Sequence, residues 1–369
     1  MGNGAFGHER TGLPAGQVAG RGLVGRRQLL RTVTTGAALA AAAPVVAACG
    51  GGDSSEQERI RFAFAPDPCW DFLKRRNVIA KFEQKYGISI ETSSTWDEFA
   101  YFAGGHGEIV STATYELPVL EERTGIETVT FGKYNLLRIT PVTRSGSGYE
   151  TLADIPKGSK IGVPSAVSST LVWAMFAKKL HDLDFRTGGG DFKLVVEDHF
   201  VMAEHVERGE LEAALVIPEA AIGLLRKKKL EVMYGGKFPW QIYGGICECQ
   251  HRGVMGNNFT ARAKWFDNHR REAAAFLAIW EEGVRLWRKN QAEIIRTFPQ
   301  HFSVEGDADV KAMQEYMKEH DWFVDSVYLD ESWIEREKGL YSSMKETGFM
   351  KKNTPTPRFE VVKPREAEQ

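Results

Sequence analysis

Two hydroxyl-rich segments of the sequence follow short apolar runs and precede predicted helices. The first spans residues 165–170, and its candidate ligand contacts are Ser165, Val167, Ser168 and Ser169. Free backbone N–H groups at a helix start, together with hydroxyl groups, favour an anionic group on a ligand. The same hydroxyls can instead only cap the helix, and both roles can hold together.

The second segment spans residues 111–116, and its candidates are Ser111, Thr112 and Thr114, which can also form a structural turn with an N-cap. Two further loops follow predicted strands. Asp67 and Trp70 come after an alternating strand, and Trp70 can either stack on a planar ligand or anchor the core. Glu219 follows the apolar run 213–217, and it can instead be an exposed acid favoured by the helix dipole. Because none of these loops contains Lys or Arg, an arginine clamp on an oxyanion is not expected.

The elements that must position these residues alternate between strands and helices. Strands are predicted near 60–66, 88–92, 108–112, 129–131 and 136–142, with helices at 71–86, 97–104 and 116–123 between them. A second β/α unit covers about 160–234, and a return strand is predicted near 251–256. Phe276, Trp280, Val284 and Trp287 have the spacing of one buried helical face. This order predicts an α/β fold whose sheets contain parallel strands.

The first 48 residues have the features of an export signal. Arg26 and Arg27 precede a weakly apolar run over 33–46, and small residues lead to Cys49. The arginine pair resembles the twin-arginine signal, with Gly25 where Ser or Thr is usual. The stretch ending at Cys49 resembles a lipobox, in which this cysteine becomes the lipidated first residue; otherwise its position is incidental. We therefore predict a signal peptide over 1–48 and a flexible tether over 49–58.

Composition and motifs narrow the class of protein. Without residues 1–48 the chain loses five arginines and one glutamate, so the net charge falls from −2 to −6, which argues against a nucleic-acid partner. Cys69, Cys247 and Cys249 permit at most one disulfide, and they are too few for a zinc site. No catalytic motif is present, so we expect no enzyme activity, metal or cofactor.

Four segments resemble type II periplasmic binding proteins, in the branch that binds nitrate, sulfonates, taurine and hydroxymethylpyrimidine precursors. These are 107–116, 149–164, 207–215 (with Glu212 where Asp is usual) and the helix 276–290. The resemblance implies two lobes, mixed sheets flanked by helices and two crossover strands. Lobe 1 would comprise 59–147 and 246–350, lobe 2 would comprise 148–245, and 351–369 would form a flexible tail.

The resemblance also implies the function. We expect a monomeric extracytoplasmic lipoprotein, held at the cell membrane by Cys49, that works with the permease and ATPase subunits of an ABC importer. Its ligand would be a small organic molecule, either sulfonate- or taurine-like, an aromatic acid or pyrimidine-like, bound in the cleft between the lobes. The alternatives are a pyrimidine-biosynthesis enzyme of the same fold, whose cysteine-rich motif this sequence lacks, and a sensor lipoprotein without transport.

Overall fold

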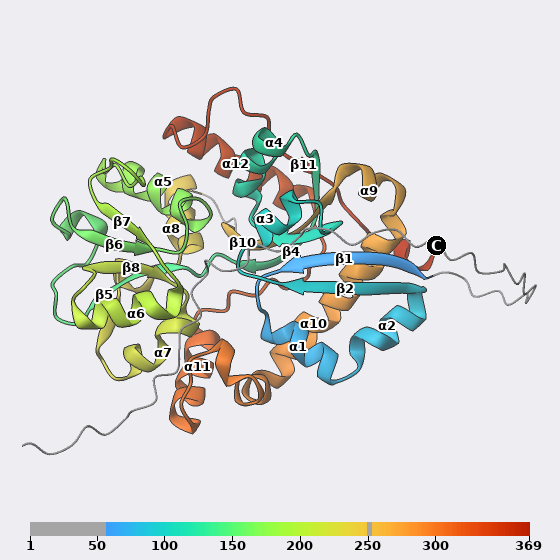
Figure 1. Cartoon of the computed structure of the whole chain (residues 1–369), viewed down its shortest axis with the longest axis horizontal. Coiled ribbons are helices and arrows are strands. Elements are labelled where there is room, and N and C mark those ends of the chain that lie inside the picture. Colours follow the sequence, from blue (N-terminus) through green and yellow to red (C-terminus); the bar gives the residue numbers. More distant parts are fainter. Residues whose placement is uncertain (1–56, 249–252) are drawn as a thin grey trace, which may run out of the picture. The chain divides into compact units, whose positions relative to one another are not determined.

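The computed structural model describes residues 57–248 and 253–369, and this part of the chain contains two β-sheets flanked by helices (Figure 1). The predicted signal over 1–48 and the tether up to residue 56 lie outside the described residues. The first sheet has the order β11-β4-β10-β3-β1-β2. Its strands are β1 (Glu58–Phe64), β2 (Ile88–Ser94), β3 (Ile109–Thr112), β4 (Thr128–Leu136), β10 (Met255–Arg262) and β11 (Arg358–Phe359).

The second sheet has the order β7-β6-β8-β5-β9. Its strands are β5 (Thr140–Arg144), β6 (Lys160–Val163), β7 (Lys193–Val196), β8 (Ala213–Val216) and β9 (Leu230–Val232). In both sheets parallel neighbours such as β1 and β2, or β6 and β7, stand beside antiparallel ones such as β10 or β5. The predicted α/β architecture with mixed sheets is therefore confirmed.

The chain passes between the sheets twice. Residues 137–139 lead from β4 to β5, and the return path reaches β10 through residues 249–252, which lie outside the described part. The two connections lie side by side, because Leu137 N donates a hydrogen bond to the Val254 oxygen at 2.8 Å. The change of sheet precedes β5 and thus comes earlier than residue 148, where we predicted the second lobe to begin.

The helices cover the faces of the sheets, and their bounds agree closely with the apolar patterns. They are α1 (Pro68–Arg75), α2 (Val78–Tyr86), α3 (Glu98–Ala103), α4 (Leu117–Thr124), α5 (Ser169–His181), α6 (His199–Arg208), α7 (Pro218–Arg226), α8 (Pro239–Cys247), α9 (Ala263–Asn268), α10 (Arg270–Thr297), α11 (Asp307–Glu319) and α12 (Glu331–Glu346).

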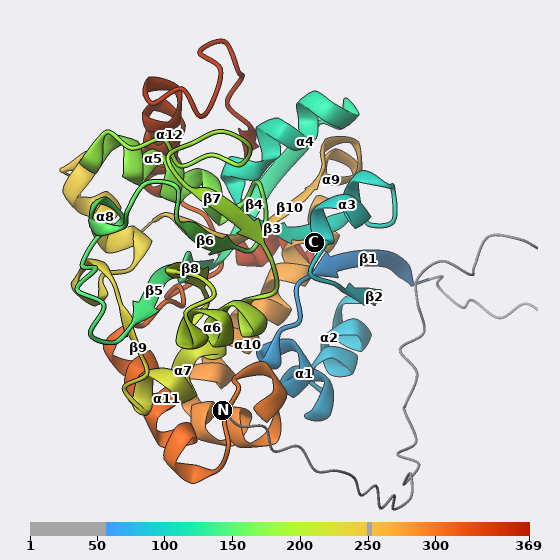
Figure 2. The same cartoon turned by 60° about the vertical axis from the view of Figure 1, so that its left-hand side comes forward.

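The long helix α10 packs on the first sheet and next to α1 (Figures 1 and 2). Its residues Phe276, Trp280, Val284 and Trp287 are all buried, as their spacing predicts. The Trp280 ring lies 4.6 Å from the Tyr134 ring of β4 and stacks at 4.9 Å on Trp70 of α1. This aromatic cluster fixes α1, and with it the loop after β1, against the sheet.

The structure differs from the sequence prediction in the first helical segment. One helix was predicted over 71–86, but Asn77 has a left-handed backbone with a φ of 54° and separates α1 from α2. Asparagine tolerates this conformation better than most residues. Asp67 then caps α1, and Pro68 occupies its first turn, where a missing N–H costs nothing.

The C-terminal region also differs from the prediction. The last residues were expected to form a flexible tail, but β11 pairs with β4, and Val362 and Ala367 are buried in the core of the first sheet. Helix α12 was expected to pack on the first lobe alone. Its early residues do so, whereas Leu340, Tyr341 and Met344 belong to the core of the second sheet. The C-terminal segment therefore contributes to both cores.

Among the described helices, none combines the length and apolar character that crossing a bilayer requires.

Candidate functional site

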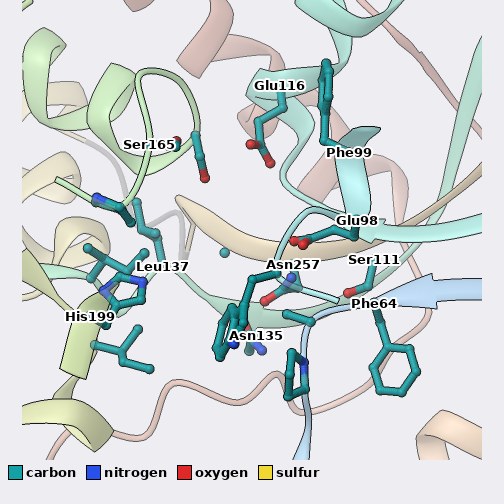
Figure 3. A pocket seen from close by; sticks show the side chains of 18 of the residues that line it. Phe64, Glu98, Phe99, Ser111, Glu116, Asn135, Leu137, Ser165, His199 and Asn257 are labelled. Carbon is teal, nitrogen blue, oxygen red and sulfur yellow. The ribbon is translucent and has the colours of Figure 1, made fainter. Parts of the chain in front are cut away.

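A cavity of ≈ 340 Å³ lies where the strand ends of both sheets meet (Figure 3). We call it the central cavity. The first sheet contributes the loops after β1 and β2, part of β3, the turn at Tyr115 and the start of β10, and the second contributes the loops after β6, β7 and β8. The cavity also touches residues 137–139 of the first connection. It has the position that ligands occupy in open α/β folds, outside the carboxyl ends of the strands.

The sequence-predicted candidates divide into two groups. Five of them line the central cavity, namely Asp67, Ser111, Ser165, Val167 and Ser168. The other five lie outside the cavity lining, namely Trp70, Thr112, Thr114, Ser169 and Glu219. Ligand contact by the first group remains a prediction, since it needs a measurement of binding.

Four residues of the second group, all except Ser169, have structural contacts that the structure shows. Thr112 donates to Glu116 at 2.7 Å, and Thr114 donates to Glu337 of α12 at 2.7 Å. Trp70 is buried in the aromatic cluster of the core, the alternative that the sequence left open. Glu219 accepts a hydrogen bond from Arg138 Nε at 2.6 Å and is buried rather than exposed.

The loop before α5 supplies the hydroxyl groups that face the cavity. The Ser165 hydroxyl donates to the Val167 oxygen at 2.7 Å, so part of its hydrogen-bonding capacity stays inside the loop. Ser168 has a φ of 60° and a ψ of −138°, and its side chain does not cap α5. A non-glycine residue rarely adopts this backbone, and such strain is concentrated at functional sites. Burial raises the pKa of Glu116, and the Ser168 hydroxyl is among the groups that oppose this shift.

Several cavity residues were not among the candidates. Glu98 stands at the start of α3 after β2, and His199 stands at the start of α6 after β7. Asn135, Arg138 and Asn257 lie where the chain passes between the sheets. The other candidate loops were chosen because they follow predicted strands. The loops after β2 and β7 also follow strands, so the same criterion points to Glu98 and His199.

The side chains of the central cavity are mainly acidic. Arg138 is the one guanidinium in its lining, and it pairs with Glu219. The carboxyl groups of the lining are Asp67, Asp97, Glu98, Glu116, Glu197 and Asp198. Asp67 accepts bonds from Cys69 N at 2.8 Å and from the Tyr134 hydroxyl at 2.9 Å, and Asp198 accepts one from Phe200 N at 2.9 Å. Glu197 contacts His205 at 2.8 Å.

Burial shifts the pKa of several cavity residues, among them Glu98, Glu116 and His199. It raises the pKa of Glu98 to about 8, with a further contribution from the neighbouring Glu116 carboxyl. It also raises the pKa of Glu116, against the bonds that this carboxylate accepts from Thr112 and Ala113. Burial lowers the pKa of His199 to about 4. Desolvation disfavours the charged form in each case, so His199 is neutral near pH 7.

Two further findings concern metal binding and the pairing of the cysteines. Within the described ranges no group of His, Cys, Asp and Glu side chains is arranged to hold a metal ion. Cys69 is buried and free, so it pairs with neither Cys247 nor Cys249. Cys247 itself is disulfide-bonded.

The comparisons with known proteins rest on structure. No protein-family model matches the sequence, and no curated protein matches it significantly. The periplasmic aliphatic sulphonate binding protein SsuA from Escherichia coli matches with a TM-score of 0.60 at 14% identity, over 84% of this chain and 91% of that one. The alkanesulfonate-binding SsuA from Xanthomonas axonopodis pv. citri, bound to MOPS, matches with a TM-score of 0.62 at 13% identity, over 82% and 97%.

A third similar structure is the CA3427 gene product of Candida albicans, described as having the generic periplasmic binding protein fold. It matches with a TM-score of 0.56 at 12% identity, over 80% of this chain and 92% of that one. At such low identities the likeness concerns the fold. This chain therefore has the periplasmic binding protein fold, as the four sequence segments predicted.

Proposed function

We propose that this chain is the extracytoplasmic solute-binding protein of an ABC importer and that it captures a small organic molecule in the central cavity. The observation that carries the proposal is the position of the cavity, which is lined by the strand ends of both sheets. A ligand there would touch both lobes at once, and closure of the lobes around it would be a hinge motion. A permease can recognise the closed conformation and so distinguish the ligand-bound protein from the free one.

The connection between the sheets is suited to act as the hinge. Residues 137–139 line the cavity and are held to the return path by the Leu137–Val254 hydrogen bond. Arg138 joins this connection to Glu219 at the start of α7. A ligand that contacts Arg138 or its neighbours would therefore act directly on the segment that relates the two lobes.

The N-terminal sequence supports an extracytoplasmic location. The basic and apolar stretches before Cys49 are those of an exported protein, and the polar segment after it can serve as a tether. We propose that Cys49 carries the lipid that holds the protein at the membrane. The proposed ligand is a sulfonate or taurine-like compound, an aromatic acid or a pyrimidine. The first of these classes agrees with the names of the SsuA neighbours.

Ligand capture can be tested by thermal-shift screening of the full chain against these three classes. A ligand that binds the folded state raises the melting temperature by mass action, corresponding to about 2.7 kcal/mol at a hundredfold excess over Kd. We expect at least one compound to do so. A broad panel without any stabilising compound would count against the proposed function.

Ser168 and Ser169 are adjacent at the start of α5, and substituting each one separately tests where the ligand binds. Ser168 lines the cavity, whereas Ser169 is buried outside its lining. We expect Ser168→Ala to weaken ligand binding about five- to tenfold through loss of one hydrogen bond. Ser169→Ala should leave the affinity unchanged. Equal effects of the two substitutions in calorimetry would mean that the ligand lies elsewhere.

Transport is separable from sensing by an uptake assay. Deletion of the gene should abolish uptake of the compound identified in the screen, and the wild-type gene should restore it. Unchanged uptake in the deletion strain would indicate a ligand sensor rather than the binding component of an importer.

A further inference from the structure

The central cavity contains a pair of carboxyl groups without a cationic partner. Glu98 comes from α3 and Glu116 from the turn before α4, and Figure 3 shows both carboxyl groups facing the pocket. In the described part of the chain neither forms an ion pair, and the Glu116 carboxyl disfavours ionisation of Glu98. Two like carboxyls in a partly desolvated site are unfavourable when both are charged, and a cation between them removes that penalty.

Three of the other acids in the lining have partners of their own. Asp67 and Asp198 cap helices through their backbone N–H groups, and Glu197 contacts His205. One oxygen of Glu116 accepts bonds from Thr112 and Ala113, which fixes the direction of the carboxylate. Glu98 has no such side-chain partner. Asp97 lacks one too, but it is exposed to water, whereas Glu98 is partly buried, so Glu98 is the acid of the lining that depends on a ligand for a partner.

Buried polar groups elsewhere in the lining give a second indication. Asn135 is 3% exposed and His199 is 7% exposed, and the Asn135 Oδ1 and His199 Nδ1 atoms have no hydrogen-bond partner. The His199 ring contacts the Leu215 backbone oxygen and so donates its proton there, which leaves Nδ1 as an acceptor. Both groups can receive a hydrogen bond from a ligand N–H. An unpartnered Trp280 Nε1 supplies one donor.

We propose that Glu98 and Glu116 select a ligand with a protonated nitrogen, such as an amine or amidine carrying N–H donors, and that the apolar part of this ligand lies against the aromatic side chains of the cavity. Trp96 and Phe99 flank Glu98 along the chain and line the same cavity, where their ring faces can attract a cation. This inference rests on the proposed solute-binding function and narrows its ligand class: a purely anionic sulfonate or aromatic acid would meet the carboxyl pair unfavourably.

The test compares aromatic probes of similar size and opposite charge on the full chain. Benzamidine, 2-phenylethylamine and a diaminopyrimidine are the cationic or protonatable probes, and benzoate and benzenesulfonate are the anionic ones. Calorimetry and thermal shift should detect binding of a cationic probe and at least about tenfold weaker binding of the anions, since one charge pair of this kind is worth about 1.4 kcal/mol or more.

The pH dependence gives an independent readout. Benzamidine keeps its charge between about pH 6 and pH 9, whereas Glu98 ionises in this window. Its affinity should rise about tenfold or more with pH, and binding near pH 7 should release protons, which calorimetry in buffers of different ionisation enthalpy measures. The other charged or titratable groups around the carboxyl pair are Asp67, Asp97, Tyr115, Tyr134, Arg138, Glu197, Asp198 and His199.

Two substitutions distinguish the effect of the carboxyl pair on affinity from the effect of the overall negative charge of the cavity. Glu98→Gln should reduce benzamidine affinity about tenfold and flatten its pH dependence. The variant should fold normally, because the amide resembles the protonated carboxyl that burial favours. Asp97→Asn removes one charge from the adjacent, exposed residue and should change the affinity less than threefold.

The inference would be overturned by an anionic probe that binds more tightly than every cationic one, by affinity that increases as the pH falls, or by equal effects of Glu98→Gln and Asp97→Asn. A bound anion would leave the proposed solute-binding function intact. Failure of every cationic probe also overturns the inference, and failure of the whole panel counts against both proposals.

Discussion

At the scale of single residues, His199 couples the site to acid stability. Burial lowers its pKa from 6.5 to about 4, with a smaller effect from Arg138. Between these values the unfolded chain binds more protons than the folded one, so acidification in this window destabilises the protein. The slope contributed by His199 is at most about 1.4 kcal/mol per pH unit.

His199→Gln should therefore reduce the loss of unfolding free energy between about pH 6.5 and pH 4.5. Denaturant titrations at several pH values measure this difference, and His106→Gln, at an exposed histidine, is the control. An identical pH dependence in the wild type and the His199→Gln variant would show that this ring is not kept neutral by burial.

The residues of the site were only partly predictable. Asp67 and Ser165 follow strands with clear apolar patterns, and Ser111 lies near the end of one, so their position at the cavity could be inferred from strand ends. Trp70 comes after β1, as Asp67 does, but it packs against Trp280 in the core. No local sequence pattern tells whether a tryptophan at this position lines the cavity or packs in the core. Asn135 and Asn257 belong to β4 and β10, and they line the cavity only because distant parts of the chain meet there.

At the scale of elements, periodicity predicted most strands and helices to within a few residues. The predicted strand at 88–92 lies within β2, and the predicted helix at 116–123 nearly coincides with α4. The break between α1 and α2 was missed because its cause is one left-handed residue, Asn77. Helix α8 was also missed, since a segment with two adjacent glycines and a proline at its start has weak helical propensity.

The return into β10 requires a residue without a side chain at position 256. A Cβ atom on Gly256 would lie 2.9 Å from Asn135 Oδ1, 3.2 Å from the Leu136 oxygen and 3.3 Å from Leu137 Cα. Gly256→Ala should therefore force the two connections apart, with a loss of about 1–3 kcal/mol in the free energy of unfolding. It should also weaken ligand binding, because Asn135 and Leu137 line the cavity.

Gly245→Ala is the matched control for this prediction. Gly245 lies in α8 with open space around its Cβ position, so alanine should leave stability unchanged or raise it by up to about 1 kcal/mol. Chemical denaturation of both variants tests the claim. A Gly256→Ala protein as stable as the wild type would mean that the connections are not closely packed.

At the scale of the whole molecule, the two-lobed organisation was predictable from the order of elements, whereas the role of the C-terminus was not. Residues 351–369 are rich in Lys, Pro and Glu, a composition typical of a frayed end. A short strand and two buried side chains are nevertheless enough to hold this segment on the first sheet. Such long-range pairing depends on a partner strand more than two hundred residues away, which local composition cannot reveal.

The proposed attachment of the protein to the membrane depends on Cys49, which lies outside the described part. If Cys49 carries a lipid, Cys49→Ala should move the exported protein from the membrane fraction to the soluble extracytoplasmic fraction, because the variant lacks the thiol that the lipid would modify. Fractionation followed by immunoblotting measures this, and the released protein should bind its ligand with unchanged affinity. Cys69→Ala, at a buried free cysteine, is the control and should leave attachment intact. Persistent membrane association of the Cys49→Ala protein would refute the lipid anchor while leaving the binding site unaffected.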